Sequence, residues 1–299
     1  MGFQIQYMKE QGLFFFFPVI TCPPPSLSHA HYREIIMNET EALQLESVSL
    51  HFASTGREIL TDISWTIRRG ERWVLFGRNG AGKTKLLEMM AGYVHPSSGK
   101  AVRFGMDRCD MRDLRRHIGY AGTALREAFP PRETVIDVVI SGIDATIGLY
   151  REPEPEEKEE ARRLVHAVGM EHLEGVRFGT LSDGEKQRIL MLRAAICGPD
   201  ILVLDEPARG LDLAAREEVM RAVAELSEMR NAAVIHVTHH VEEITPLFTM
   251  LFILHGGRRL YSGDLQAGLT AANLTRVFGR TVELERRHGR YYACIAPQS

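Results

Sequence analysis

The order of hydrophobic and polar positions predicts strands at the start of the patterned part of this chain. Residues 43–52 and 59–67 alternate between apolar and polar side chains, the period of two that half-buried strands show. A short apolar run, 73–76, follows a glycine turn, and residues 83–91 then carry leucine and methionine at helical spacing. We therefore expect an antiparallel β unit followed by a strand, a loop and a helix that begin a parallel sheet.

The middle of the chain predicts a helical insertion at about residues 110–180. Residues 134–147 have the spacing of an amphipathic helix, and residues 156–168 predict another helix with Pro155 in its first turn. The acidic run 152–160 would suit a metal ion or a basic partner. A solvated helix start is the simpler interpretation, because the helix dipole favours negative charge there.

The α/β pattern then returns. Residues 201–204 form a buried-type strand, and Asp212 is placed to cap a helix over residues 213–229. Two further strands are expected at 233–238 and 250–254. The chain is expected to end in a short helix and a hairpin, at residues 271–277, 281–285 and 290–295.

Composition is ordinary for a globular protein of 299 residues, with 44% hydrophobic and 25% charged residues. The net charge of −3 gives no electrostatic reason to expect nucleic-acid binding. The four cysteines (Cys22, Cys109, Cys197 and Cys294) lie far apart, so we expect a reducing compartment rather than disulfides or a metal site.

The strongest chemical signal is the run from Gly77 to Thr84, which fits the pattern of a phosphate-binding loop. Glycines let successive backbone N–H groups turn toward phosphate oxygens. Lys83 is expected to reach the β- and γ-phosphates of ATP, and the Thr84 hydroxyl to bind Mg²⁺. The predicted nucleotide-binding residues are Gly77, Arg78, Asn79, Gly80, Ala81, Gly82, Lys83 and Thr84.

Two acidic residues end the buried run 201–204 and provide the second part of the site. Asp205 is expected to hold Mg²⁺, directly or through water. Glu206 would point the other way along the strand and orient or deprotonate the attacking water. A strand ending in two acidic residues is weak evidence by itself, and the phosphate-binding loop before it makes the interpretation strong.

Residues 181–188, Leu-Ser-Asp-Gly-Glu-Lys-Gln-Arg, decide between families of phosphate-loop proteins. They resemble the signature motif of ATP-binding cassette (ABC) ATPases, usually Leu-Ser-Gly-Gly-Gln, with Ser182 and Gly184 matching and Asp183 and Glu185 departing. The resemblance implies a head-to-tail homodimer in which Ser182 of one subunit faces the γ-phosphate held by Lys83 of the other. Alone, Ser182 would be interpreted as a helix N-cap.

Other segments resemble the same family in the same order. Residues 208–212 look like the loop after the catalytic strand, and residues 237–240 look like the switch-histidine segment, which makes His239 the residue expected to touch the γ-phosphate. Phe52 lies near the position of the aromatic residue that stacks on adenine, but it could equally be a core residue. The resemblance implies an α/β fold: a phosphate-loop NTPase core with an N-terminal antiparallel β subdomain and an inserted helical subdomain.

One family feature is missing. The family usually places a glutamine after a strand reading Ile-Gly-Tyr-Val-Pro-Gln, whereas residues 118–123 read Ile-Gly-Tyr-Ala-Gly-Thr. Thr123 therefore replaces a residue that binds Mg²⁺ and senses the membrane partner. ATP-binding proteins of the molybdate-linked, photorepair type carry a small hydroxyl residue there, and residues 269–279 resemble the ends of iron-complex importer ATPases.

The first 36 residues stand apart from the rest. Their apolar run, residues 12–21, is about half as long as a membrane span and resembles the core of a signal peptide. We favour another interpretation, because an ATP-binding module works where ATP is. Since Met37 stands just before the first strand, residues 1–36 are expected to be a disordered tail or an extension from a misassigned start. The expected domains are then an ABC ATPase domain at 37–262 and an appendage at 263–299.

The leading functional hypothesis is the ATP-hydrolysing subunit of an ABC transporter, working with Mg²⁺ as a homodimer beside membrane permease subunits. Such a subunit would be cytoplasmic and peripheral at the inner face of the cell membrane. The alternative is a soluble ABC-type ATPase without a permease, acting on a macromolecule or in regulation, and Thr123 favours it. A third reading, a binding module without turnover, conflicts with the presence of both Lys83 and Glu206.

Overall fold

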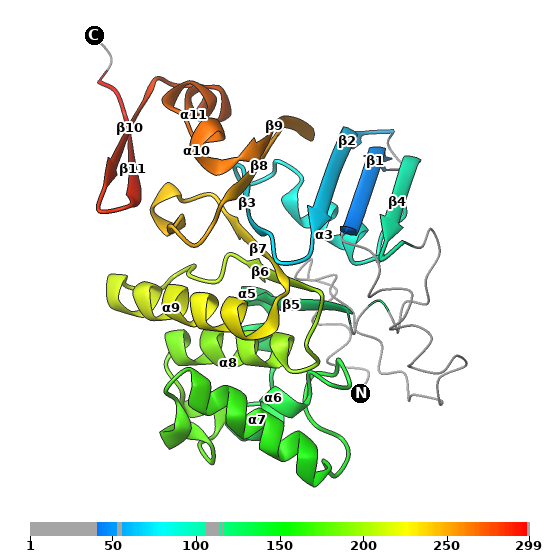
Figure 1. Ribbon diagram of the computed structural model, residues 1–299, viewed down its shortest axis with the longest axis vertical. Coiled ribbons are helices and arrows are strands. Elements are labelled where there is room, and N and C mark those ends of the chain that lie inside the picture. Colours follow the sequence, from blue (N-terminus) through cyan, green and yellow to red (C-terminus); the bar gives the residue numbers. More distant parts are fainter. Residues whose placement is uncertain (1–40, 53–55, 106–113, 115–116, 298–299) are drawn as a thin grey trace.

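The computed structural model describes residues 41–52, 56–105, 114 and 117–297, and only the backbone of Thr123, Ala124 and Arg230. The expectations about residues 1–36, Met37, Cys22 and Cys109 lie outside the described residues. Within the described residues, the chain forms a three-stranded, a six-stranded and a two-stranded sheet, and a group of helices lies in the lower part of Figure 1.

An antiparallel three-stranded sheet occupies one side of the molecule. Its central strand β1 (Glu41–His51) pairs with β2 (Glu58–Arg68) and with β4 (Ser98–Arg103). The sequence pattern predicted β1 and β2. It did not predict β4, because three exposed residues, Ser98, Gly99 and Lys100, begin that strand and leave little apolar alternation to detect.

A six-stranded sheet forms the centre, in the order β5–β6–β7–β3–β8–β9. Its neighbours pair in parallel except β8 and β9, which are antiparallel and joined by a turn at Gly256 and Gly257. The strands are β3 (Arg72–Phe76), β5 (Ile118–Gly122), β6 (Ile201–Asp205), β7 (Ala233–Thr238), β8 (Met250–His255) and β9 (Arg258–Asp264).

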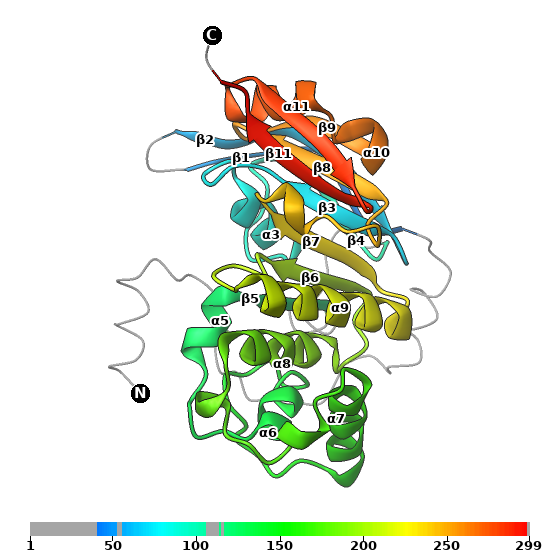
Figure 2. The ribbon, with the colours of Figure 1, turned by 90° about the vertical axis from the view of Figure 1, so that its left-hand side faces the viewer.

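Alternation along these strands divides the buried side chains between two cores. In β3, Trp73 and Leu75 point into the core shared with the three-stranded sheet and α3 (Lys83–Met90). Val74 and Phe76 point to the other side, where helices cover the sheet. Figure 2 shows the strands of the sheet between these layers. Burial on both faces explains why the central strands β3, β6, β7 and β8 have nearly continuous apolar sequences.

The helical part lies below the six-stranded sheet in Figures 1 and 2. Because β5 is a strand of the main sheet, this part starts after Gly122 rather than near residue 110. Helix α7 begins at the predicted Pro155 and is closed by a capping box between Glu154 and Glu157. The helices are α5 (Thr123–Ala128), α6 (Val135–Ile140), α7 (Pro155–Ala167) and α8 (Asp183–Ala195), with short 3₁₀ turns at Glu171–Leu173 and Phe178–Thr180.

The helix predicted over residues 134–147 is too long, because α6 ends at Ile140. The tertiary structure stops it: a Cβ on Gly142 would lie 2.1 Å from the Arg193 carbonyl oxygen of α8, so this segment crosses α8 at very close range. The buried Arg193 side chain then holds the turn, donating to Ser141 Oγ (3.2 Å) and to the Thr146 carbonyl (2.9 Å). Burial lowers the pKa of Arg193 to about 10.

The C-terminal part follows the predicted order. Helix α9 (Leu213–Arg230) starts at Asp212, whose carboxylate accepts a hydrogen bond from the Ala215 amide at 2.8 Å. The terminal hairpin packs against the 3₁₀ turn η3 (Val241–Glu243) and carries Arg290, which donates to the Glu242 carbonyl. The remaining elements are α10 (Leu265–Gly268), α11 (Ala271–Phe278), β10 (Val282–Arg287) and β11 (Arg290–Ile295).

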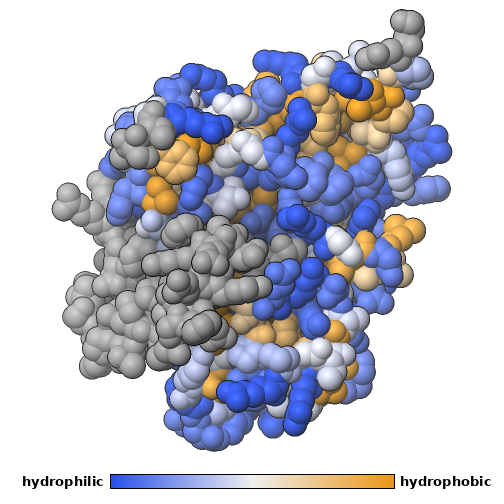
Figure 3. Space-filling view, turned by 180° about the vertical axis from the view of Figure 1, so that it is seen from behind, coloured by the Kyte–Doolittle hydropathy of each residue, from blue (hydrophilic) through white to orange (hydrophobic). Residues whose placement is uncertain are grey.

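The described surface mixes hydrophilic and hydrophobic side chains. Figure 3 shows small orange groups between larger blue areas on one face. Among the described residues, no helix has the length and apolar character required to span a membrane.

Candidate functional site

The predicted phosphate-binding loop connects β3 to α3 and turns sharply between them. Gly80 (φ 79°) and Gly82 (φ 105°) take left-handed backbone conformations that side chains with a Cβ rarely adopt. Gly82 directly precedes Lys83, the first residue of α3, so the loop ends at the positive end of this helix. The sequence-level expectation of strand, glycine loop and helix is confirmed.

Lys83 is only 7% exposed and lies inside the loop. Its ammonium group donates to the carbonyls of Gly77 (2.6 Å) and Arg78 (3.4 Å) and lies 4.0 Å from Glu206 Oε1. Burial lowers the pKa of Lys83, against the opposing effect of the Glu206 and Asp205 carboxylates. The loop thus holds a cationic donor directly opposite two acidic side chains.

The two acidic residues follow from the end of β6. Asp205 pairs in register with Gly122 of β5, and the Glu206 amide donates to the Val237 carbonyl of β7 at 2.9 Å. Glu206 has a φ of 48°, in the left-handed region. The strand alternation ends here, and both residues line one cavity, with the Glu206 carboxylate turned toward His239 at the end of β7.

Asp205 is held by a residue that the sequence analysis did not select. The Tyr120 hydroxyl, on the neighbouring strand β5, donates to Asp205 Oδ2 at 2.8 Å. Burial, together with the Asp205 charge, raises the pKa of Tyr120 well above its usual range. Burial also raises the pKa of Asp205, and the Tyr120 hydrogen bond works against that increase.

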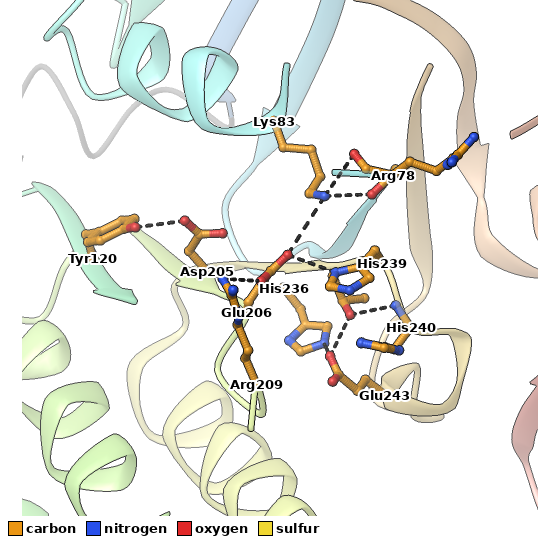
Figure 4. A network of polar contacts seen from close by, with 12 residues as sticks. Arg78, Lys83, Tyr120, Asp205, Glu206, Arg209, His236, His239, His240 and Glu243 are labelled. Carbon is orange, nitrogen blue, oxygen red and sulfur yellow. Dashed lines mark hydrogen bonds and ion pairs between the residues drawn. The ribbon is translucent and has the colours of Figure 1, made fainter. Parts of the chain in front are cut away.

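Glu206 is surrounded by polar side chains, as Figure 4 shows. His239, at the end of β7, has its Nδ1 at 2.8 Å from Glu206 Oε1, and Arg209 lies 3.4 Å from Glu206 Oε2. The centre of the His239 ring also lies 4.0 Å from that of the next residue, His240, which belongs to the same switch-histidine segment. The contact with Glu206 distinguishes them: His239 faces the acidic pair.

Lys83, Asp205, Glu206 and Arg209 line one open cavity of about 450 Å³, whereas His239 contacts Glu206 from outside that lining. Phe52, 48% exposed, lies at its wall, as the adenine-stacking interpretation requires, and is not a core residue. Four lining residues had no assigned role in the sequence analysis: Arg57, Ile59, Lys85 and Arg209. Arg209 was visible in the segment 208–212, whereas the others come from elements whose relative positions only the fold establishes.

The signature residues lie elsewhere. Neither Ser182 nor Gly184 is among the residues that line this cavity. Ser182 is an exposed N-cap of α8, accepting from the Glu185 amide at 3.3 Å within a capping box. Gly184 is buried against α9, where a Cβ would come 3.1 Å from the Ala215 Cβ. The N-cap interpretation of Ser182 is confirmed, and within the motif Ser182 and Asp183 are exposed while Gly184 packs against the start of α9.

The cavity suits a nucleoside triphosphate. Its wall combines an aromatic ring, a backbone cradle at a helix start and a buried lysine, the groups that bind a base and its phosphates. Among the described residues, no group of three or more His, Cys, Asp or Glu could hold a metal ion by itself. Mg²⁺ that arrives with phosphates needs only one or two protein ligands, and the exposed Thr84 beside Asp205 fits that requirement.

Comparisons with known proteins agree with this geometry. The profile of the ABC transporter family matches residues 60–209. YlmA, an uncharacterized ABC transporter ATP-binding protein of Bacillus subtilis (strain 168), is 39% identical over 246 residues, which cover 81% of this chain and 92% of that protein. The molybdate/tungstate import ATP-binding protein WtpC of Pyrococcus horikoshii is 32% identical over 225 residues, covering 75% of this chain and 62% of that protein.

A solved structure has the same architecture. The protein cbiO1 from Clostridium perfringens, part of the ABC transporter complex cbiONQ, superposes with a TM-score of 0.70 at 25% identity, covering 80% of this chain and 94% of that chain. This likeness confirms the predicted α/β fold with its antiparallel β subdomain. Because the family profile spans half of the sequence and YlmA is similar over nearly its whole length, this chain belongs to the ABC transporter family, as one of its ATP-binding, ATP-hydrolysing proteins.

Proposed function

We propose that this chain hydrolyses ATP with the cluster in Figure 4 and so drives a membrane permease. The observation that carries the proposal is the convergence of Lys83, Asp205, Glu206 and His239 on one cavity or its rim. Lys83 binds the phosphates, and Glu206 takes the proton of the attacking water while its contact with His239 orients its carboxylate. Thr84 and Asp205 would hold Mg²⁺, which would neutralise charge on the phosphates.

The working unit is a head-to-tail homodimer that closes around two ATP molecules. A single chain leaves the cavity open, and its signature residues lie outside it. Ser182 is exposed at the start of α8, where its hydroxyl and the helix dipole form a second cradle for anions. A γ-phosphate that contacts Lys83 of one subunit and Ser182 of the other would favour the closed state, because it gains both contacts only there.

The partner in this proposal is a permease, with the chain cytoplasmic and peripheral at the inner face of the cell membrane. The support is the similarity to YlmA, to WtpC and to cbiO1, which are named as transporter ATP-binding proteins or as part of a transporter complex. No cargo is assigned, because the cavity described above binds only the nucleotide.

The test is purification of the tagged Glu206→Gln protein from gently solubilised native membranes with ATP and Mg²⁺ present. A multi-spanning membrane protein in near-equal amount is the expected result. The Lys83→Ala protein is the control, since it should neither bind ATP nor form the closed dimer. A soluble homodimer that carries no membrane protein would instead support the second candidate, a stand-alone ABC-type ATPase, which the Thr123 substitution favours.

A further inference from the structure

The segment in which this chain departs from its family lies directly beside the candidate Mg²⁺ ligand. Strand β5 is paired in parallel with β6, so that Tyr120 lies opposite Val203 and Gly122 opposite Asp205. The family pattern has proline and glutamine where this chain has Gly122 and Thr123. The loss of the glutamine is therefore accompanied by the loss of a larger residue immediately before it.

The glycine makes space for a particular tyrosine position. A Cβ on Gly122 would lie 2.6 Å from the Tyr120 hydroxyl oxygen and 2.9 Å from Cζ of its ring. A Cβ is essentially never found within 3.0 Å of another heavy atom. With alanine or proline at position 122, the Tyr120 ring would therefore have to move from this position. Gly122 has an ordinary extended backbone (φ −151°), so space and not backbone strain is what requires the glycine.

In this position, the Tyr120 hydroxyl donates to Asp205 Oδ2 at 2.8 Å and leaves Oδ1 as the carboxylate oxygen for a cation. Carboxylates that bind metals usually have such a donor on the oxygen opposite the metal, which fixes their rotation. The rest of the Tyr120 ring lines an apolar cavity with residues such as Leu87, Ile118 and Val203. A phenylalanine at position 120 would keep this packing and remove only the hydrogen bond to Asp205.

We infer that Tyr120 is a positioning residue for Mg²⁺: its hydroxyl, admitted by Gly122, holds Asp205 in the orientation that binds the ion, in a site whose family glutamine is replaced by Thr123. The inference rests on the proposed binding of Mg²⁺ with ATP. It concerns how tightly Mg²⁺ joins the bound nucleotide, a property that can be measured without any hydrolysis.

The experiment is a titration of Mg²⁺ into protein with a fluorescent ATP analogue bound, on the Glu206→Gln background so that the analogue is not hydrolysed. In the Tyr120→Phe variant, the half-saturating Mg²⁺ concentration should rise about 10-fold or more. Binding of the analogue in EDTA should stay unchanged, because Tyr120 does not line the phosphate cavity. Gly122→Ala should give the same rise, since it displaces the hydroxyl.

The matched control is Tyr150→Phe, which removes an exposed hydroxyl that donates to the Ile147 carbonyl and should leave the titration unchanged. Equal half-saturating Mg²⁺ in Tyr120→Phe and the parent protein would overturn the inference. Weaker binding of the ATP analogue by Tyr120→Phe in EDTA would also overturn the inference, because a structural defect would then explain the higher half-saturating Mg²⁺ concentration. Failure of the parent protein to bind the analogue at all would instead reject the proposed function.

Discussion

At the scale of single residues, the site consists of charges that the fold holds near one another. Glu206 contacts Lys83, Arg209 and His239 within 4.0 Å. Lys83 and Glu206 are largely buried and each would be costly to bury alone, and their opposite charges compensate one another. Substitutions here can change the ATP hydrolysis rate, the binding of ATP and the free energy of unfolding, and each of these can be measured separately.

Replacing Glu206 with glutamine should lower the ATP hydrolysis rate by about 10²- to 10⁴-fold, because an amide cannot accept the proton of the attacking water. ATP binding, measured by calorimetry in Mg²⁺, should be kept or become tighter. The matched control is Glu228→Gln on the exposed surface of α9, which should hydrolyse ATP at the wild-type rate. A Glu206→Gln protein with a normal rate would remove this residue from the mechanism.

Glu243, which does not line the nucleotide cavity, makes a pH-dependent contribution to the free energy of unfolding. Its buried carboxylate accepts from the Thr238 hydroxyl at 2.5 Å and lies 3.5 Å from His236 Nε2, an electrostatic contact at that length. Burial raises the pKa of Glu243, but His236 and Thr238 outweigh it and leave the pKa below the usual value. A lowered folded-state pKa stabilises the protein above the unfolded value of about 4.3, and this contribution is lost as the pH falls through the folded value.

Glu243→Gln should therefore lower the free energy of unfolding by about 1–3 kcal/mol at pH 7, with the deficit shrinking below about pH 4. Urea unfolding of both proteins across this pH range measures it. The neighbouring Glu242→Gln is the control and should follow the wild-type curve. A deficit of the same size at every pH would mean that packing, and not the charge, is responsible.

At the scale of elements, the C-terminal hairpin is attached to the segment that follows His239. Arg290 of β11 donates to the Glu242 carbonyl of η3 and forms an ion pair with Glu217 of α9. Tyr291, beside it, is buried in the core on the helical side of the sheet. The hairpin thus joins α9 to the turn that continues from the switch-histidine segment.

Arg290→Ala should release this attachment and increase amide hydrogen exchange in Val241–Glu243 and in β10 and β11 by several-fold. The melting temperature should change little, because a partly exposed ion pair contributes at most about 1 kcal/mol. Arg287→Ala, which removes the exposed contact with Glu285 in the same hairpin, is the control. Unchanged exchange in the turn would show that the hairpin does not restrain it.

At the scale of the whole molecule, the proposed dimer predicts complementation between two inactive variants. Lys83→Ala removes the phosphate-binding cation, and Ser182→Arg blocks the signature surface of the other half-site. In a mixed head-to-tail dimer, one site has both defects and the other has neither. Equal mixing should therefore restore about a quarter of the wild-type ATPase activity, because half of the dimers are mixed and one site in each is intact.

Glu228→Gln mixed with Lys83→Ala gives the reference activity for a pair in which one partner is fully active. If Ser182 acted only as an N-cap within its own chain, the mixture of Lys83→Ala and Ser182→Arg would remain as inactive as either protein alone. That outcome would contradict the head-to-tail arrangement.

The local patterns of the sequence determined most elements and the phosphate-binding loop by themselves. Residues 233–238 formed the strand that their apolar run predicted, and Asp212 capped α9, because these outcomes depend on neighbours in the chain. The order of the motifs also grouped Lys83, Asp205, Glu206 and His239 into one site. The first three line one cavity and His239 contacts Glu206, in agreement with that grouping.

What only the tertiary structure decided depends on segments that meet from distant positions. Helix α6 ends early because α8 crosses it at Gly142, and β4 forms because β1 offers its edge. The fold places Asp205 and Glu206 at one cavity, and the pairing of β5 with β6 places the Tyr120 hydroxyl on Asp205, 85 positions away. Periodicity reports which face of an element is buried, but not which distant group will lie against it.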